Sequence, residues 1–252
     1  MSDACDKEAL SIQIKNLYTE LALHPEREFG WSKGKENTAS LGYHQQWIEQ
    51  LPDEVWESAA AVGNPFSLGP VYSGETVADL GCGTGADLCV AALLVGENGK
   101  VIGIDFTAAM VKKAKQNARL AGLTNITVYE SPIESLPLES STVDTVISNG
   151  AINISSSKES VFSEIYRVLK EDGKLYFADM IKDEDNECQS SYSGSSSESW
   201  GDCVAGTLKS QEVIQLMEEA GFTNAEHVST THYKTADSTV GATFRAMKKA
   251  KQ

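Results

Sequence analysis

From about residue 76 onward, short apolar runs alternate with longer amphipathic stretches. The short runs have the length of buried strands and lie at 77–80, 100–104, 128–130, 143–148 and 174–179. The longer stretches repeat their apolar residues at helical spacing and lie at 86–95, 108–121 and 158–169. Because strands and helices alternate, these strands are expected to be parallel, with helices packed on both faces of the sheet.

The C-terminal part continues the sheet. A helix is predicted at 210–220, followed by strands at 225–234 and 240–247 that pair as an antiparallel edge. The stretch 183–202 is rich in Ser, Asp and Glu, which predicts a mobile polar loop. We therefore predict an α/β fold: a Rossmann-like, doubly wound, mostly parallel seven-stranded sheet with helices on both faces and an N-terminal helical extension.

The N-terminal residues have a separate pattern. Helices are predicted at 8–23, 43–50 and 52–62, with an irregular stretch at 24–42. We predict three parts: a helical extension or lid at 1–70, a cofactor-binding core at 71–182, and at 183–252 the polar loop with the remaining strands of the same domain.

Composition excludes several kinds of partner. The chain has 36 acidic and 21 basic residues and a formal net charge of −15. Nucleic acids and anionic membranes are held by basic surfaces, so this balance favours a small-molecule substrate over both. No apolar run approaches the roughly 18 residues of a membrane span, and the N-terminus lacks an apolar signal core. A cytoplasmic location is expected.

The motif with the clearest chemistry is the run Thr76-Val-Ala-Asp-Leu-Gly-Cys-Gly-Thr-Gly85. Its glycines, Gly81, Gly83 and Gly85, follow a predicted strand and precede a helix, and glycine allows both a tight turn and close approach of a ligand to the main chain. About twenty residues later, Asp105 ends the next strand, where a carboxylate can accept the hydroxyls of a ribose. This pairing indicates an adenosine-containing cofactor.

Two cofactors fit the glycines. Gly81, Gly83 and Ala86 match the dinucleotide pattern G-x-G-x-x-A, which leaves NAD open. Asp79 would repel the pyrophosphate of NAD but would suit a cationic amine. Tyr166 and Lys170 also match the Y-x-x-x-K pair of short-chain dehydrogenases, whose glycine turn is missing here. An NAD-dependent oxidoreductase therefore stays only a minor alternative.

The turn Asp79-Leu-Gly-Cys-Gly-Thr-Gly85 resembles the first motif of class I S-adenosylmethionine methyltransferases. From about residue 63 to 222 the chain is most similar to the arsenite methyltransferase branch. The segments that carry this similarity are Val62-Gly-Asn-Pro65, Leu93-Leu-Val-Gly-Glu97, Gly103-Ile-Asp-Phe-Thr107, Ser148-Asn-Gly-Ala-Ile-Asn153, Ile165-Tyr-Arg-Val-Leu-Lys170 and Cys203-Val-Ala-Gly-Thr-Leu208. The resemblance implies S-adenosyl-L-methionine as cofactor and S-adenosyl-L-homocysteine as product.

The resemblance also implies roles for individual residues. The expected cofactor-binding residues are Asp79, Gly81, Cys82, Gly83, Gly85, Asp105, Phe106, Ile133, Glu134, Asn149, Tyr18 and Trp31. Ile133 would contact the adenine ring and Glu134 its exocyclic amine. Asn149 would face the methyl group, and the aromatic rings of Tyr18 and Trp31 would attract the sulfonium cation.

The methyl acceptor depends on the cysteines. The five cysteines form no C-x-x-C pair, so free thiols are expected. Cys203 matches the arsenic-binding cysteine of the family, and Cys188 could provide a second thiolate for trivalent arsenic. Gly150 stands where the arsenite enzymes carry another cysteine, and none precedes Asn64-Pro65, where they carry a third.

Other acceptors and roles stay open. His44 could act as a general base for an oxygen or nitrogen acceptor. A small organic acceptor, such as a thiol, a quinone-like ring or a natural-product hydroxyl, is the main alternative to arsenic. A protein that holds the cofactor without turnover is a further alternative.

Overall fold

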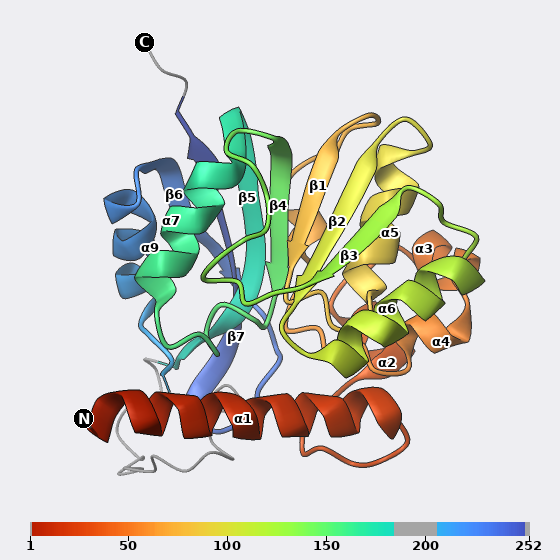
Figure 1. Cartoon of the computed structure of the whole chain (residues 1–252), viewed down its shortest axis with the longest axis horizontal. Helices are drawn as coiled ribbons and strands as arrows, with labels where there is room; N and C mark the ends of the chain where they lie inside the picture. The colour runs from red at the N-terminus through yellow and green to blue at the C-terminus, as the bar shows by residue number, and fades with distance from the viewer. Residues whose placement is uncertain (1, 184–205, 250–252) are drawn as a thin grey trace.

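The computed structural model describes residues 2–183 and 206–249. Seven strands form one sheet in the order β3-β2-β1-β4-β5-β7-β6 (Figure 1). Their bounds are β1 (Thr76–Leu80), β2 (Lys100–Asp105), β3 (Ile126–Glu130), β4 (Val143–Asn149), β5 (Leu169–Lys182), β6 (Phe222–Thr230) and β7 (Thr239–Lys248). The first five are parallel, and β7 is antiparallel to both of its neighbours. The predicted fold class is confirmed.

Helices cover both faces of this sheet. In the described residues, the core helices are α5 (Ala86–Val95), α6 (Ala108–Leu120), α7 (Lys158–Val168) and α9 (Ser210–Glu219). Leu88 of α5 and Val111 of α6 share a buried cluster with Val77, whereas Phe162 of α7 shares another with Ala78. Because successive residues of a strand point to opposite faces, α5 and α6 lie on one side of the sheet and α7 on the other.

Helix α5 has the bounds that the sequence predicts, while β5 is longer than predicted. Glycines enclose α5 at both ends, with φ of 91° at Gly85 and 66° at Gly96, a conformation that favours glycine. The predicted strand at 174–179 extends to Leu169–Lys182 because β5 pairs with β4 on one side and with β7 on the other. These partners stabilise polar residues that an isolated strand would not retain.

The N-terminal residues form five short or amphipathic elements. They are α1 (Ser2–Leu23), α2 (Gly34–Ser40), α3 (Gln45–Gln50), α4 (Asp53–Trp56) and the 3₁₀ helix η1 (Pro65–Ser67). Figure 1 shows α1 running across one end of the sheet, where its Leu21 packs against Met110 of α6. No helix within the described part of the chain is long and apolar enough to span a membrane.

Two predictions for this region were wrong. Helix α2 lies inside the stretch that was expected to be irregular. The predicted helix at 52–62 ends as α4 at Trp56. In the residues that follow, the carbonyl of Ala59 accepts from the N–H of Gly34 and the N–H of Val62 bonds to the side chain of Asn149, instead of forming helical hydrogen bonds. The segment 58–63 is therefore held against the core by a tertiary contact.

Candidate functional site

The glycine turn after β1 brings the main chain to the edge of a cavity. Gly81 has φ of 69°, and a Cβ there would lie 2.2 Å from Cβ of Ala151. Gly83 has φ of 51°, but a Cβ there would meet no protein atom within 4 Å. The first glycine is thus required for packing within the protein, whereas the second leaves the backbone open to a ligand.

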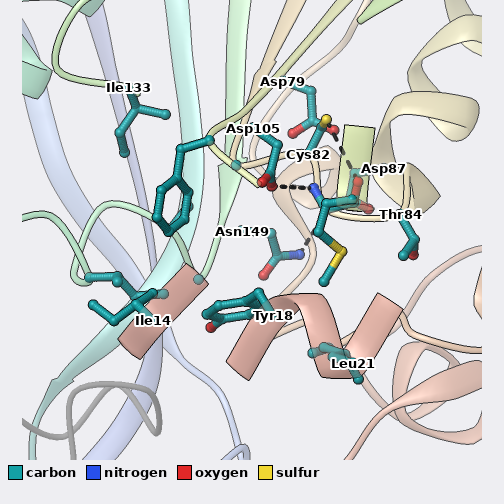
Figure 2. Close-up of a pocket in the computed structure, with 18 of the residues that line it drawn as sticks. Ile14, Tyr18, Leu21, Asp79, Cys82, Thr84, Asp87, Asp105, Ile133 and Asn149 are labelled. Atoms are coloured by element: carbon teal, nitrogen blue, oxygen red, sulfur yellow. Dashed lines mark hydrogen bonds between the residues drawn. The ribbon is translucent and has the colours of Figure 1, made fainter. Parts of the chain in front are cut away.

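The cavity has a volume of about 230 Å³ and lies after the carboxyl ends of β1, β2 and β4. This is the edge at which ligands bind in open α/β sheets. Its walls come from the glycine turn, the loops at 132–134 and 150–156, the segment 58–61 and α1. Figure 2 shows Ile14, Tyr18 and Leu21 of α1 facing the carboxylates across the cavity.

Three buried carboxylates, those of Asp79, Asp87 and Asp105, line this cavity. Asp79 is 2% exposed, and its Oδ2 has no hydrogen-bond partner among the described residues. Burial, and then the charges of Asp87 and Asp105, raise the pKa of Asp79 well above its usual range. A cationic group placed here would relieve both the missing hydrogen bond and the repulsion.

Asp105 is held at the end of β2 by the backbone. Its Oδ1 accepts from the N–H of Thr107 at 2.8 Å and its Oδ2 from the N–H of Gly83 at 3.0 Å. Burial raises the pKa of Asp105 to about 6, although these hydrogen bonds oppose the shift. Next to it, the ring of Phe106 lies 5.7 Å from Nζ of Lys15, which links α1 to this end of the sheet.

Most of the predicted cofactor-binding residues lie at this one cavity. Its lining includes Asp79, Gly81, Cys82, Gly83, Asp105, Phe106, Ile133, Glu134, Asn149 and Tyr18. Glu134 accepts a hydrogen bond from the hydroxyl of Ser155, which fixes its carboxylate at the cavity wall. Gly85 caps α5 behind the turn, where it packs on Ala114, and does not line the cavity.

Asn149 lies at the cavity but is tied to the protein. Its Oδ1 accepts from the N–H of Val62 at 2.8 Å, and its Nδ2 lies 2.9 Å from both the carbonyl of Gly63 and Oδ2 of Asp87. The hydroxyl of Tyr43 donates to Oδ1 of Asp87 at 2.6 Å and lies 3.1 Å from Nδ2 of Asn149. These contacts hold the amide of Asn149 at the cavity wall by hydrogen bonds to the segment at 62–63 and to Asp87.

Asp87 and Tyr43 were missed as parts of the same network. The sequence shows Asp87 only as an acidic residue in the first turn of a helix, where it would interact favourably with the helix dipole whatever its function. Tyr43 is surrounded by the rings of Trp47, Trp56 and Phe66, so its side chain is buried. The signal that could have identified both is the pairing of a buried phenol with a buried carboxylate, which only the fold reveals.

Two predicted residues lie away from the cavity. Trp31 is not part of its lining and packs with Phe29 at 5.5 Å between ring centroids. His44 is exposed at the N-terminus of α3, with its ring centroid 4.7 Å from that of Trp47. Neither side chain lines this cavity.

The cysteines divide into two groups. Cys188 and Cys203 lie outside the described residues. Cys82 and Cys89 are buried and free, and burial raises the pKa of the Cys82 thiol well above its usual range and that of Cys89 to about 12. Both are therefore neutral thiols at physiological pH and are poor ligands for a soft metal. Gly150 lines the cavity with φ of 71°, and a Cβ there would lie 3.2 Å from Cγ2 of Val62.

Comparisons with known proteins agree with this geometry. A model of the methyltransferase domain family matches residues 72–221. The arsenite methyltransferase of Halobacterium salinarum is 32% identical over 191 residues, which cover 74% of this chain and 46% of that protein. A ubiquinone/menaquinone biosynthesis C-methyltransferase of Klebsiella pneumoniae is 31% identical over 64% of this chain and 71% of that protein.

A solved structure shows the same similarity. The arsenic (III) S-adenosylmethionine methyltransferase of Chlamydomonas reinhardtii is 30% identical, with a TM-score of 0.59 over 88% of this chain and 76% of that one. The chain spans about half the length of the curated arsenite methyltransferases that it matches.

The cavity also fits the cofactor of these proteins. Asp79 offers an unpartnered buried acceptor for a cationic amine, and the backbone at Gly83 is open to a ligand. Asp105 stands where a ribose is held in Rossmann-like folds. With S-adenosylmethionine as its cofactor, this chain belongs to the class I S-adenosylmethionine-dependent methyltransferases, in the branch of the arsenite methyltransferases.

Proposed function

We propose that the protein transfers a methyl group from S-adenosylmethionine to trivalent arsenic that is bound by the thiolates of Cys203 and Cys188. The observation that supports methyl transfer most is Asp79, whose Oδ2 lies buried in the cavity without a partner among the described residues. The arsenic acceptor is supported by the names of the relatives and by the match of Cys203 to their motif.

The cofactor supplies an electrophilic methyl group on a sulfonium, so the protein has to orient the reactants and exclude water. Asp79 and Asp105 would hold the amine and the ribose. Helix α1 covers the cavity with Ile14, Tyr18 and Leu21. Trivalent arsenic carries a lone pair and needs no general base. This agrees with the exposed position of His44, away from the cavity.

A small organic acceptor is the second candidate. Gly150, Ala151 and Ile154 give the cavity a wall without a thiol at the position where the arsenite enzymes carry a cysteine. The Klebsiella relative is named for methylation in quinone biosynthesis, which supports a ring carbon as the alternative target. The three carboxylates disfavour an anionic acceptor in either case.

The test is methyl transfer from labelled S-adenosylmethionine to arsenite in the presence of a reducing thiol. Wild type should form methylated arsenic, and Cys203→Ser should lower the rate by at least about 100-fold, because a hydroxyl does not replace a thiolate as a ligand of soft arsenic. Cys188→Ser should reduce the rate as well, while Cys5→Ser is the matched control and should not. Full arsenic methylation by Cys203→Ser would exclude Cys203 as an arsenic ligand, whereas a wild-type protein that binds the cofactor but forms no methylated arsenic would favour the organic acceptor.

Cofactor binding should release protons near neutral pH. In the free protein the raised pKa of Asp79 favours its protonated form, whereas a bound ammonium favours the carboxylate. Up to about one proton should leave per bound S-adenosylhomocysteine, and affinity should rise with pH as Asp79 ionises more easily. Calorimetry in phosphate and in Tris buffer measures this release. If protons are released, the observed binding enthalpies differ between the two buffers and become equal only after correction for buffer ionisation. Equal observed enthalpies would contradict the prediction.

A further inference from the structure

The loop at 150–157 forms one wall of the cavity without regular secondary structure. It supplies Gly150, Ala151, Ile154 and Ser155 to the lining, although Ile152 and Asn153 are themselves buried. Buried backbone N–H and C=O groups need hydrogen-bond partners, and a loop cannot provide them from its own strand or helix. Backbone carbonyls serve Gly150 and Ser155, and two charged side chains outside the loop supply partners for Asn153 between them.

Asp179 accepts a hydrogen bond from the loop at Asn153. It lies near the carboxyl end of β5 and is 4% exposed. Its Oδ2 accepts from the N–H of Asn153 at 2.8 Å, and its Oδ1 accepts from the N–H of Met180 at 2.8 Å. Burial raises the pKa of Asp179 to about 6, while these hydrogen bonds and the charge of Lys158 oppose the shift. The side chain is therefore mostly ionised at neutral pH and can accept both bonds.

Lys158 satisfies the C=O groups. From the first position of α7, its Nζ donates to the carbonyl of Asn153 at 2.9 Å and to that of Ser155 at 3.0 Å. Asp179 and Lys158 thus hold Asn153 from its two sides, one at the N–H and the other at the C=O. Both residues also line a small second cavity behind the loop. Asp179 and Lys158 therefore contact the loop from the side of the second cavity and not from the side of the cofactor cavity.

Ser155 connects this loop to the wall of the cofactor cavity. Its hydroxyl donates to Glu134 on the neighbouring loop, and it also accepts from the N–H of Ser157 at 3.1 Å. We infer that Asp179 and Lys158 are positioning residues, which clamp the loop at 150–157 so that Ser155 holds Glu134 and Gly150 and Ala151 border the site of methyl transfer. This inference rests on the proposed function, but the clamp itself is measurable without turnover.

A second Asp–Lys pair offers a matched control. Asp144 accepts from Nζ of Lys170 at 2.7 Å and from the N–H of Thr76 at 2.9 Å. Like Asp179, it accepts from a backbone N–H, but its lysine bonds to the carboxylate itself. It lies near the start of β4, whereas the cavity lies beyond that strand's end, and neither Asp144 nor Lys170 lines the cavity.

The experiment compares Asp179→Asn, Lys158→Met and Asp144→Asn with wild type. An asparagine at 179 keeps one acceptor but turns an amide N–H₂ toward the second backbone donor. We expect the amides at 152–155 to exchange hydrogen at least about tenfold faster in both clamp variants, and the dissociation constant of S-adenosylhomocysteine to rise by about tenfold. Amides in β1 and β2 should exchange as in wild type, and Asp144→Asn should leave ligand affinity unchanged.

Unchanged exchange at 152–155, or unchanged affinity in both clamp variants, would overturn the inference. If Asp179→Asn does not fold, Lys158→Met carries the test, because it keeps the aliphatic stem and removes only the bonds to the two carbonyls. Exchange and ligand affinity require no acceptor. A protein that methylates nothing would therefore contradict the proposed function while leaving the clamp testable.

Discussion

Asp79→Asn should weaken binding of S-adenosylmethionine by at least about 100-fold, because losing one partner of a buried charge pair costs about 2–5 kcal/mol. The same substitution should stabilise the free protein. Asp79 is buried beside Asp87 and Asp105, so folding must either add a proton to its carboxyl group or keep a repelled charge there, and a neutral amide avoids both costs. A gain of about 1 kcal/mol would raise the melting temperature by roughly 2–4 °C. Lower affinity combined with higher stability distinguishes a ligand-binding carboxylate from a structural one.

Calorimetric titration and thermal unfolding of the same samples measure both effects. Asp53→Asn is a suitable control, since Asp53 is an exposed carboxylate in an ion pair with Lys35. It should change neither quantity by more than a small amount. An Asp79→Asn variant that binds the cofactor as wild type does would show that the cationic amine is held elsewhere.

Asn149→Asp should be the most destabilising single substitution in the cavity wall. The change is isosteric, but it places a carboxylate oxygen where Nδ2 now lies 2.9 Å from Oδ2 of Asp87 and 2.9 Å from the carbonyl of Gly63. A buried charge without a partner typically costs about 3–5 kcal/mol. Asn149→Ala should cost less, about 1–3 kcal/mol, because it removes a partner from backbone groups of Val62 and Gly63 but adds no charge.

Urea unfolding at several pH values tests this order. The destabilisation by Asn149→Asp should shrink as the pH falls, since protonation of either carboxylate removes the repulsion. The loss caused by Asn149→Ala should be nearly independent of pH in the same range. Equal and pH-independent losses in the two variants would show that Asn149 does not lie against Asp87.

The sequence predicts those parts of the fold and site that depend on local patterns. The helix at 86–95 is bounded by glycines, and Asp79 and Asp105 follow from their places at the ends of predicted strands. Their expected roles follow from their position at the carboxyl ends of parallel strands, where ligands bind. The topology of the sheet determines which edge this is. A motif of about thirty residues is enough to locate this half of the site.

The remainder depends on contacts between segments far apart in the chain. The predicted helix at 52–62 ends early, and no pattern within that segment indicates the contact of Val62 with Asn149. Tyr43 and Asp87 are separated by 44 positions, and each has an ordinary local explanation. Asp179 and Lys158 bond to backbone groups of a loop, and the pattern of side chains along the sequence does not reveal such bonds.

Gly150 illustrates where family resemblance and local structure differ. The arsenite enzymes carry a cysteine there, whereas this chain has a glycine at φ of 71° with Val62 close to where a Cβ would lie. A side chain at this position would be strained, so the backbone of the loop is adapted to glycine. The proposed arsenic site therefore takes its thiolates from Cys203 and Cys188, since Cys82 and Cys89 are buried neutral thiols.

A crystal structure of the complex with S-adenosylhomocysteine tests the central claim most directly. We predict that the ligand's amino group lies within hydrogen-bonding distance of Oδ2 of Asp79, with the ribose hydroxyls on Asp105 and the adenine beside Ile133. A ligand bound in this cavity with its amino group away from Asp79, or bound elsewhere on the protein, would contradict the account.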